Sequence, residues 1–261
     1  MRLGGRVALV TGGAGGLGSA TVRHLAEVGM QVLIFDRDGD RAGELAKELV
    51  ANGSGVSVLA VGGDTTSDED AAAAIDSAQS LGVLSLLVNV AGGATGGGRT
   101  VARDGRPHDK AVFAGTLDMN VLGTFNMSRL VAAAIAANEP DEQGQRGVIV
   151  NTASIAGLEG QAGQLAYATA KAAILGMTLP MARDLAALGI RVCAIAPGTM
   201  GTPIMLSVRE ELKEQLVKNI MFPKRMGRPE EFALLVESIA TNPYLNGENI
   251  RLDGALRFAP K

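Results

Sequence analysis

Hydrophobic residues in this chain form seven short, continuous runs, and longer amphipathic stretches separate them. The runs cover residues 6–11, 31–36, 56–61, 84–89, 147–152, 190–197 and 248–254. Continuous runs, unlike alternating ones, are typical of strands in a parallel sheet whose two faces are both covered. The stretches at 17–29, 40–52 and 67–82 have helical spacing and close on glycine or asparagine. The pattern predicts an α/β fold in which helices cover both faces of a doubly wound, seven-stranded parallel sheet.

Two segments break this regularity. Residues 92–110 are rich in glycine and basic side chains, and we interpret them as a loop insertion over the site or the surface. Residues 199–225 are apolar and irregular around one helical stretch, which suits a substrate lid. Because α/β folds of about 250 residues often form one unit, we expect residues 1–261 to be a single domain.

Composition and charge narrow the class of protein. Hydrophobic residues make up 47% of the chain, and 24 basic and 27 acidic residues leave a formal net charge of −3. With no basic stripe, we expect no nucleic-acid partner. The single cysteine, Cys193, lies in an apolar run and is expected to be a buried thiol. With no uninterrupted apolar run of 18 residues and a strand close to the start, we expect no membrane span or leader and a cytoplasmic protein.

A glycine-rich turn follows the first predicted strand. In TGGAGGLG, the residues Gly12, Gly16 and Gly18 lie between a strand and a helix, and Gly15 and Leu17 lie among them. Glycines allow the sharp turn and let the backbone approach a pyrophosphate, which then meets the amides at the helix N-terminus. The turn predicts a dinucleotide-binding Rossmann fold.

Acidic and polar residues end the next strands. Asp36 follows Gly18 by 18 residues, where a carboxylate accepts hydrogen bonds from both ribose hydroxyls and repels a 2′-phosphate. The neighbouring Arg37 favours NADP instead, but we expect Asp36 to dominate and predict NAD. The alternative for Asp36 is a helix N-cap or solvated turn. We expect further contacts at the ends of the third and fourth strands, from Asp64, Thr65, Asn89, Val90, Ala91 and Gly92. Asp64 is equally compatible with a helix cap.

Redox chemistry is indicated by Tyr167, Lys171 and Ser154. The spacing of Tyr167 and Lys171 places both side chains on one helix face, one turn apart. A free tyrosine has a pKa of about 10, so a general base near neutral pH needs a fixed cation, which Lys171 supplies. Ser154 ends a strand-like run and is placed to bond the reacting oxygen. The alternative is that Tyr167 is a partly buried aromatic residue with a structural role.

Together these motifs resemble the short-chain dehydrogenase/reductase family over essentially the whole chain. The resemblance implies a catalytic tetrad of Asn120, Ser154, Tyr167 and Lys171, in which Asn120 helps to hold a water of the proton relay. It also adds cofactor contacts at Tyr167, Lys171, Pro197, Gly198, Met200 and Thr202. One departure is Val90, where the family usually has a second asparagine.

Longer stretches around 125–154, 176–192 and 242–257 resemble the type II short-chain 3-hydroxyacyl-CoA dehydrogenases. That resemblance implies NAD, a homotetramer and a 3-hydroxyacyl-CoA substrate, with activity on some hydroxysteroids. Two rivals share parts of the pattern. One is an NADPH-dependent reductase of 3-oxoacyl groups on acyl carrier protein, against which Asp36 argues, and the other is a non-catalytic nucleotide-binding scaffold.

Other polar residues carry weaker hypotheses. Arg99, Arg103, Arg106 and Lys110 form a basic cluster in the insertion, suited either to coenzyme A phosphates or to solvation. Gln161 and Gln164, between the serine and the tyrosine, are candidate substrate contacts or plain loop residues. The two histidines, His24 and His108, lack metal-ligand partners in the sequence, and we predict no metal site.

Overall fold

The computed structural model describes residues 1–53 and 55–259. Its seven strands form one parallel sheet in the order β3-β2-β1-β4-β5-β6-β7. They are β1 (Val7–Thr11), β2 (Gln31–Asp36), β3 (Val58–Gly62), β4 (Leu84–Asn89), β5 (Gly147–Thr152), β6 (Ile190–Pro197) and β7 (Asn249–Leu252). The seven strands and the doubly wound sheet predicted from the sequence are confirmed.

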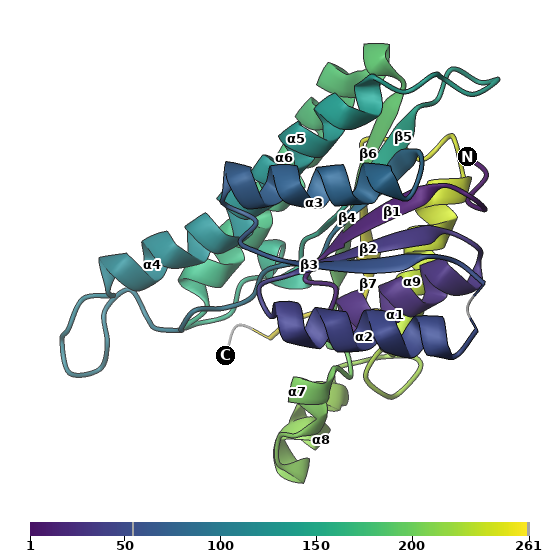
Figure 1. Cartoon of the computed structure of the whole chain (residues 1–261). Helices are drawn as coiled ribbons and strands as arrows, with labels where there is room; N and C mark the ends of the chain where they lie inside the picture. Colours follow the sequence, from purple (N-terminus) through teal and green to yellow (C-terminus); the bar gives the residue numbers. More distant parts are fainter. Residues whose placement is uncertain (54, 260–261) are drawn as a thin grey trace.

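Helices cover both faces of the sheet (Figure 1). One face is packed by α1 (Gly16–Glu27), α2 (Gly39–Ala51) and α9 (Pro229–Thr241). The other is packed by α3 (Asp68–Ser80), α5 (Gly123–Ala136) and α6 (Leu165–Leu185). Side chains of β1 enter the two cores alternately, which explains why its run is apolar throughout.

The chain changes direction across the sheet at β1, which pairs with β2 on one side and β4 on the other. Helices that follow these strands therefore diverge to opposite faces, and a crevice opens at the carboxyl ends of the strands. Open α/β sheets bind ligands at this switch point. The glycine turn after β1 lies there.

The turn leaves no room for a side chain at Gly18. A Cβ built there would lie 2.0 Å from the carbonyl oxygen of Gly12, so the backbone would have to move. We expect Gly18→Ala to lower the free energy of unfolding by about 2 kcal/mol or more, as overpacking does. Gly43→Ala is the matched control, because a Cβ at Gly43 in α2 would meet no other described part of the chain within 4 Å, and alanine favours a helix there. Denaturant unfolding measures both, and equal effects would contradict the packing argument.

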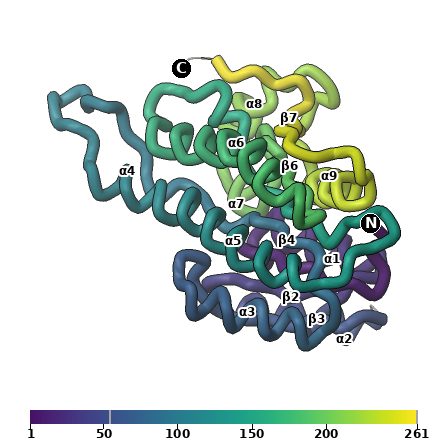
Figure 2. Tube along the Cα trace, turned by 90° about the horizontal axis from the view of Figure 1, so that it is seen from above, coloured from purple at the N-terminus to yellow at the C-terminus, as the bar shows by residue number. Residues whose placement is uncertain are grey.

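Both irregular segments project from the body of the fold (Figure 1), and the projection of the insertion is also visible from above (Figure 2). The insertion forms an arm in which Val101 and Pro107 pair as a short antiparallel bridge, and it leads into α4 (Lys110–Leu117) and η1 (Asp118–Leu122), a π-helical turn. The predicted lid contains α7 (Pro203–Leu206) and α8 (Glu210–Lys218). Its most exposed apolar side chains are Ile204, Leu206, Met221 and Phe222.

One long apolar helix was not recognised from the sequence. Residues 165–188, comprising α6 and η3 (Ala186–Leu188), are long and apolar enough to cross a membrane by length and composition, with a mean hydropathy of 1.2. In the fold this helix packs against β6 and against η2 (Ile155–Gly157), the turn that follows Ser154. It also carries Tyr167 and Lys171. Part of its apolar surface packs into the two cores, and 39% of the apolar window is buried.

Candidate active site

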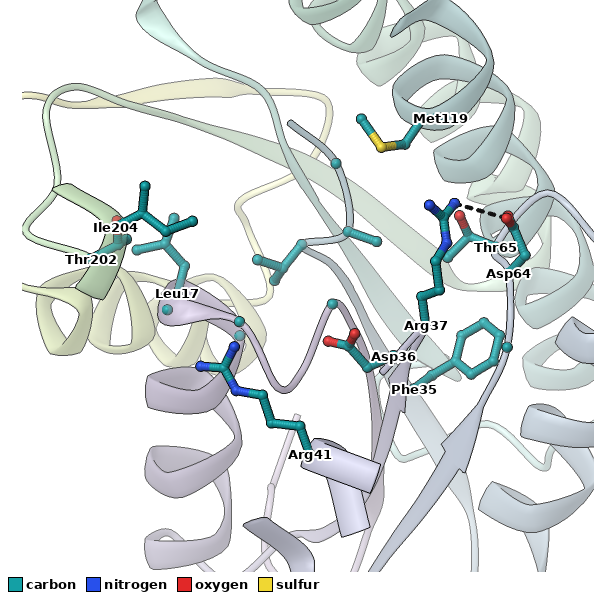
Figure 3. Close-up of a pocket in the computed structure, with 18 of the residues that line it drawn as sticks. Leu17, Phe35, Asp36, Arg37, Arg41, Asp64, Thr65, Met119, Thr202 and Ile204 are labelled. Atoms are coloured by element: carbon teal, nitrogen blue, oxygen red, sulfur yellow. Dashed lines mark hydrogen bonds and ion pairs between the residues drawn. The ribbon is translucent and has the colours of Figure 1, made fainter. Parts of the chain in front are cut away.

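A cleft of about 430 Å³ opens at the switch point (Figure 3). Twelve of the predicted cofactor residues line it, and they come from the glycine turn, the ends of β2, β3 and β4, and the start of the lid. They are Gly12, Gly15, Gly16, Leu17, Gly18, Asp36, Asp64, Thr65, Val90, Ala91, Gly92 and Thr202. Tertiary structure therefore brings together residues spread over 190 positions of the chain (12 to 202).

The walls of the cleft leave no room for side chains at Gly12 and Gly16. A Cβ at Gly12, whose φ is +61°, would lie 2.7 Å from the amide nitrogen of Ala91. A Cβ at Gly16 would lie 2.7 Å from Cβ of Thr202. Gly15 is the N-cap of α1, and its cap position has no side chain to satisfy the helix amides. The first turn of α1 thus offers free N–H groups and a positive dipole end to a phosphate group.

Asp36 lies in the cleft beyond this turn (Figure 3). Its carboxylate accepts hydrogen bonds from the amides of Ala14, at 2.9 Å, and Asp38, at 3.1 Å. These contacts fix the carboxylate at the strand end while leaving lone pairs for ligand hydroxyls. The glycine turn and Asp36 are therefore placed to bind the phosphate and the ribose of one extended ligand.

Arg37, the residue that favoured NADP in the sequence, forms an ion pair with Asp64. Its guanidinium donates a 2.8 Å hydrogen bond to Asp64 across the mouth of the cleft (Figure 3). Asp64 is also held by the amide and hydroxyl of Thr66. These bonds, led by the Thr66 amide, hold the pKa of Asp64 below its usual range. Asp64 is therefore an ionised partner for Arg37 at neutral pH.

Sequence reasoning missed several lining residues. Phe35, Arg41, Gly63, Met119, Pro203 and Ile204 all border the cleft. Arg41 reaches toward the glycine turn from α2 (Figure 3). Phe35, Gly63, Met119 and Pro203 each lie next to a predicted residue in the sequence, and that adjacency could have identified them. Arg41 carries no local signal, because its placement depends on how α2 packs.

Asn89 lies behind the cleft and does not line it. It is 2% exposed, and its amide donates to Ser128 at 3.0 Å and to Asn151 at 2.9 Å. The hydroxyl of Thr11 accepts the amides of Val90 and Ala91. This buried network joins β1, β4, β5 and α5. Asn89 thus acts with Thr11 to fix the backbone that borders the cleft.

Ser154, Tyr167 and Lys171 converge at the end of β5. Ser154 lies close enough to Tyr167 to lower the pKa of its phenol, and the Lys171 nitrogen lies 5.7 Å from the centre of the Tyr167 ring. Lys171 also donates a 2.9 Å hydrogen bond to the carbonyl of Thr152. Tyr167 and Lys171 therefore lie on one helix face, as their spacing predicted, and Ser154 approaches this face from the turn after β5.

Burial strongly affects this group. It lowers the pKa of Lys171 to about 8 and raises the pKa of Tyr167, an effect that the nearby Ser154 side chain partly opposes. Taking the ammonium and the phenolate out of water disfavours both charged forms. We expected Lys171 to favour the phenolate, and the structure adds desolvation as an opposing effect on that ionisation.

Asn120 is held in the π-helical turn η1, a distortion often found at functional sites. It is fully buried, and its side-chain amide donates to the carbonyls of Gly93, at 2.7 Å, and Thr116, at 2.8 Å. Its side-chain oxygen accepts the amide of Gly93. A Cβ at Gly92, whose φ is +147°, would lie 2.5 Å from this oxygen and 3.4 Å from the Lys171 nitrogen. Asn120 therefore lies beside Lys171 and anchors the start of the insertion.

The remaining predicted residues lie outside the cleft lining. Pro197 ends β6, Gly198 packs on Asp253, and Met200 is buried. Gln161 donates to the carbonyl of Ala259, and the side-chain oxygen of Gln164 is buried with no hydrogen-bond partner among the described residues. Within residues 1–53 and 55–259, no three His, Cys, Asp or Glu side chains are grouped to hold a metal ion. His24 instead pairs with Glu237 at 2.6 Å.

Comparison with known proteins agrees with this geometry. The short chain dehydrogenase family model matches residues 6–213. The 3-hydroxyacyl-CoA dehydrogenase type-2 of Drosophila melanogaster is 48% identical over 255 residues, which cover 97% of this chain and 98% of that protein.

Two solved structures show the same fold. The crystal structure of 3-hydroxyacyl-CoA dehydrogenase type-2 from Mycobacterium avium is 51% identical with a TM-score of 0.94, and the match covers 98% of each chain. A 7α-hydroxysteroid dehydrogenase complexed with NADH and 7-oxo glycochenodeoxycholic acid is 28% identical with a TM-score of 0.88, covering 100% of this chain and 97% of that one. With its matching family model, near-full-length relatives and parallel sheet, this chain belongs to the short-chain dehydrogenase family.

Proposed function

We propose that this protein oxidises the 3-hydroxyl group of a 3-hydroxyacyl-CoA thioester to a ketone, with NAD as hydride acceptor. The observation that carries the proposal is the convergence of Ser154, Tyr167 and Lys171 beside a glycine-walled cleft with Asp36 in it. The thioester is inferred from the relatives of 48% and 51% identity, whose names specify that substrate class. The hydroxysteroid dehydrogenase is a more distant relative, at 28%.

The residues divide the work of alcohol oxidation. Ser154 positions the substrate hydroxyl, and Tyr167 removes its proton as general base. NAD, when bound, would supply the hydride acceptor for the carbon–hydrogen bond that breaks, and its oxidised nicotinamide would add a positive charge to the site. Because burial raises the pKa of Tyr167, this ring charge and the Lys171 ammonium are the two factors that favour the phenolate.

Other residues hold the cofactor and return the proton. Lys171 also binds the nicotinamide ribose, and Asn120 holds a water that links Lys171 to solvent. Thr202 lies against Gly16 at the N-terminus of α1, which favours a contact with the pyrophosphate over one with the carboxamide. The amides of α1 bind the pyrophosphate.

NAD is favoured over NADP by the charges of the cleft. Asp36 occupies the strand end, where a carboxylate bonds ribose hydroxyls and repels a 2′-phosphate. Arg37, which would attract that phosphate, is engaged by Asp64 at 2.8 Å. Asp36 and the Arg37–Asp64 pair therefore leave less positive charge to attract the 2′-phosphate of NADP.

Asp36→Asn tests the cofactor assignment. The amide keeps an oxygen that can accept from Ala14 but removes the negative charge. Hydrogen bonds to charged groups contribute roughly 1.5–3 kcal/mol, so we expect the preference for NAD over NADP to fall by about 10- to 100-fold. Titration with NADH and NADPH measures it. Asp40→Asn, with the same charge change at an exposed helix position, should leave the preference unaltered. An unchanged preference in Asp36→Asn would remove Asp36 as its determinant.

The substrate is tested by offering purified protein 3-hydroxybutyryl-CoA with NAD, and separately with NADP. Free 3-hydroxybutyrate and a hydroxysteroid are the comparison substrates, and NADH formation is followed by absorbance. Rapid turnover of the thioester alone supports the proposal. Turnover of the free acid or the steroid alone would discard the thioester, and turnover only with NADP would discard the cofactor assignment.

We also propose that the protein is a homotetramer, as the family resemblance suggests, and that it is cytoplasmic, as we expect from its sequence. Light scattering of the purified protein gives the mass of the assembly, which is four times 26.7 kDa for a tetramer. A monomeric or dimeric mass would exclude it. Fractionation of cells tests the location.

A further inference from the structure

The segment that follows β7, near the end of the described chain, contacts two segments that lie far apart in sequence. We call residues 253–258, which follow β7, the C-terminal strap. One neighbour is residues 155–165, the segment between Ser154 and Tyr167, here called the catalytic loop. The other is the lid, residues 199–225, whose first residues line the cleft. The two neighbours lie far apart in sequence, and the strap contacts both.

Charged groups join the catalytic loop to the strap. Glu159 accepts a 2.8 Å hydrogen bond from Arg251 at the end of β7 and a 2.9 Å bond from the amide of Phe258. Arg251 also pairs with Asp253 at 2.7 Å and donates to the carbonyl of Leu256. The side chains of Glu159 and Arg251 are 25% and 23% exposed, and that of Asp253 is 7% exposed. A partly buried network is screened less by solvent than an isolated surface pair.

Backbone hydrogen bonds join the strap to the lid. The carbonyl of Gly254 accepts the amide of Met221 at 3.0 Å and the amide of Phe222 at 3.3 Å. A Cβ at Gly254, whose φ is +58°, would lie 2.9 Å from the side chain of Ile220, so the two segments are in close contact. The strap therefore binds the end of the lid through main-chain groups.

A separate hydrophobic cluster connects all three segments. Ile155 of the catalytic loop, Leu256 of the strap and Ile220 of the lid are each at most 3% exposed and belong to one core cluster. Phe258 and Val217 pack against it. Because tightly packed interiors transmit displacements, a shift in one segment is felt by the others.

We propose that the C-terminal strap couples the catalytic loop to the lid, and that Glu159 is a positioning residue for the substrate. Glu159 acts through the strap rather than on the reacting atoms. The lid and the catalytic loop then hold their spacing as one unit, and weakening Glu159 loosens substrate binding more than it slows chemistry. The inference rests on the proposed function in taking these segments as two walls of the substrate site.

Glu159→Gln tests the coupling, with Glu48→Gln as matched control. Glu48 pairs with Arg23 between α1 and α2, so its variant loses the same charge and one ion pair away from the strap. Hydrogen exchange should rise at the amides of Met221 and Phe222 in Glu159→Gln alone. We also expect KM for 3-hydroxybutyryl-CoA to rise about five-fold, with kcat and the Kd of NADH changed by less than about two-fold.

Three results would overturn the coupling. They are faster exchange confined to the catalytic loop and strap, an unchanged KM, and an equal loss of kcat and NADH binding. If Glu159→Gln does not fold, Phe258→Ala keeps the acidic side chain and removes the apolar contact, and the same exchange at residues 221–222 decides. Exchange and NADH binding need no substrate, so a wild-type protein inactive toward the thioester would refute the proposed function while leaving this test intact.

Discussion

Tyr167→Phe is expected to lower kcat by about 10³-fold or more, while NADH binds with nearly unchanged affinity. General acid–base groups typically contribute 10²–10⁴-fold, and phenylalanine keeps the ring that packs in the site but removes the only proton acceptor proposed for the reaction. Steady-state kinetics and NADH titration measure the two quantities separately.

Tyr244→Phe provides the matched control, because the other tyrosine of the chain is 98% exposed and lies outside the cleft. It should behave as wild type. If Tyr167→Phe lost NADH affinity as strongly as turnover, Tyr167 would be a structural part of the cofactor site and not the base. Retained turnover would move the proton transfer to another group.

Lys171→Met is expected to abolish turnover and at the same time stabilise the protein. A pKa lowered from 10.5 to about 8 by burial means that folding disfavours the ammonium by about 3 kcal/mol, at roughly 1.4 kcal/mol for each pH unit. The hydrogen bond to Thr152 offsets about 1 kcal/mol of that. Below pH 8 we therefore expect the methionine variant to be more stable by about 1–2 kcal/mol. Lys47→Met, at an exposed position of α2, should show no such gain.

The pH dependence has a definite sign. Between about pH 8 and pH 10 the unfolded chain binds more protons at Lys171 than the folded protein does, so wild-type stability rises with pH through this window. The penalty is fully present below pH 8. Denaturant unfolding as a function of pH should show the rise in wild type and its absence in Lys171→Met. A variant that is less stable than wild type below pH 8 would refute the burial penalty.

Residues proposed to serve catalysis in this site thus also lower the stability of the fold. The ammonium of Lys171 is removed from water, Tyr167 is half-buried, and Asn120 lies fully buried beside Lys171. Groups with opposing ionisation preferences in one dry site are typical of catalytic centres. Lys171→Met is expected to show both effects, because the variant loses turnover and gains stability.

Much of the fold was predictable from the sequence because its signals are local. The continuous apolar runs at β1, β4 and β5 required burial on both sides, and the glycines after β1 required a turn without side chains. The spacing of Tyr167 and Lys171 required only helical geometry. Asp36 needed only its position after β2.

Tertiary structure decided what those residues contact. Arg37 is adjacent to Asp36 in sequence, but the packing of β3 beside β2 supplies Asp64 as its partner. Asn89 was predicted as a cofactor contact, and its burial against Ser128 and Asn151 depends on α5 and β5 meeting β4. The sequence by itself therefore determined the parallel sheet, the glycine turn and the face with Tyr167 and Lys171, because these follow from periodicity and steric demand. Only the folded chain decided the burial that shifts the pKa values of Tyr167 and Lys171, the engagement of Arg37 and the strap around Glu159, because each depends on contacts between residues far apart in sequence.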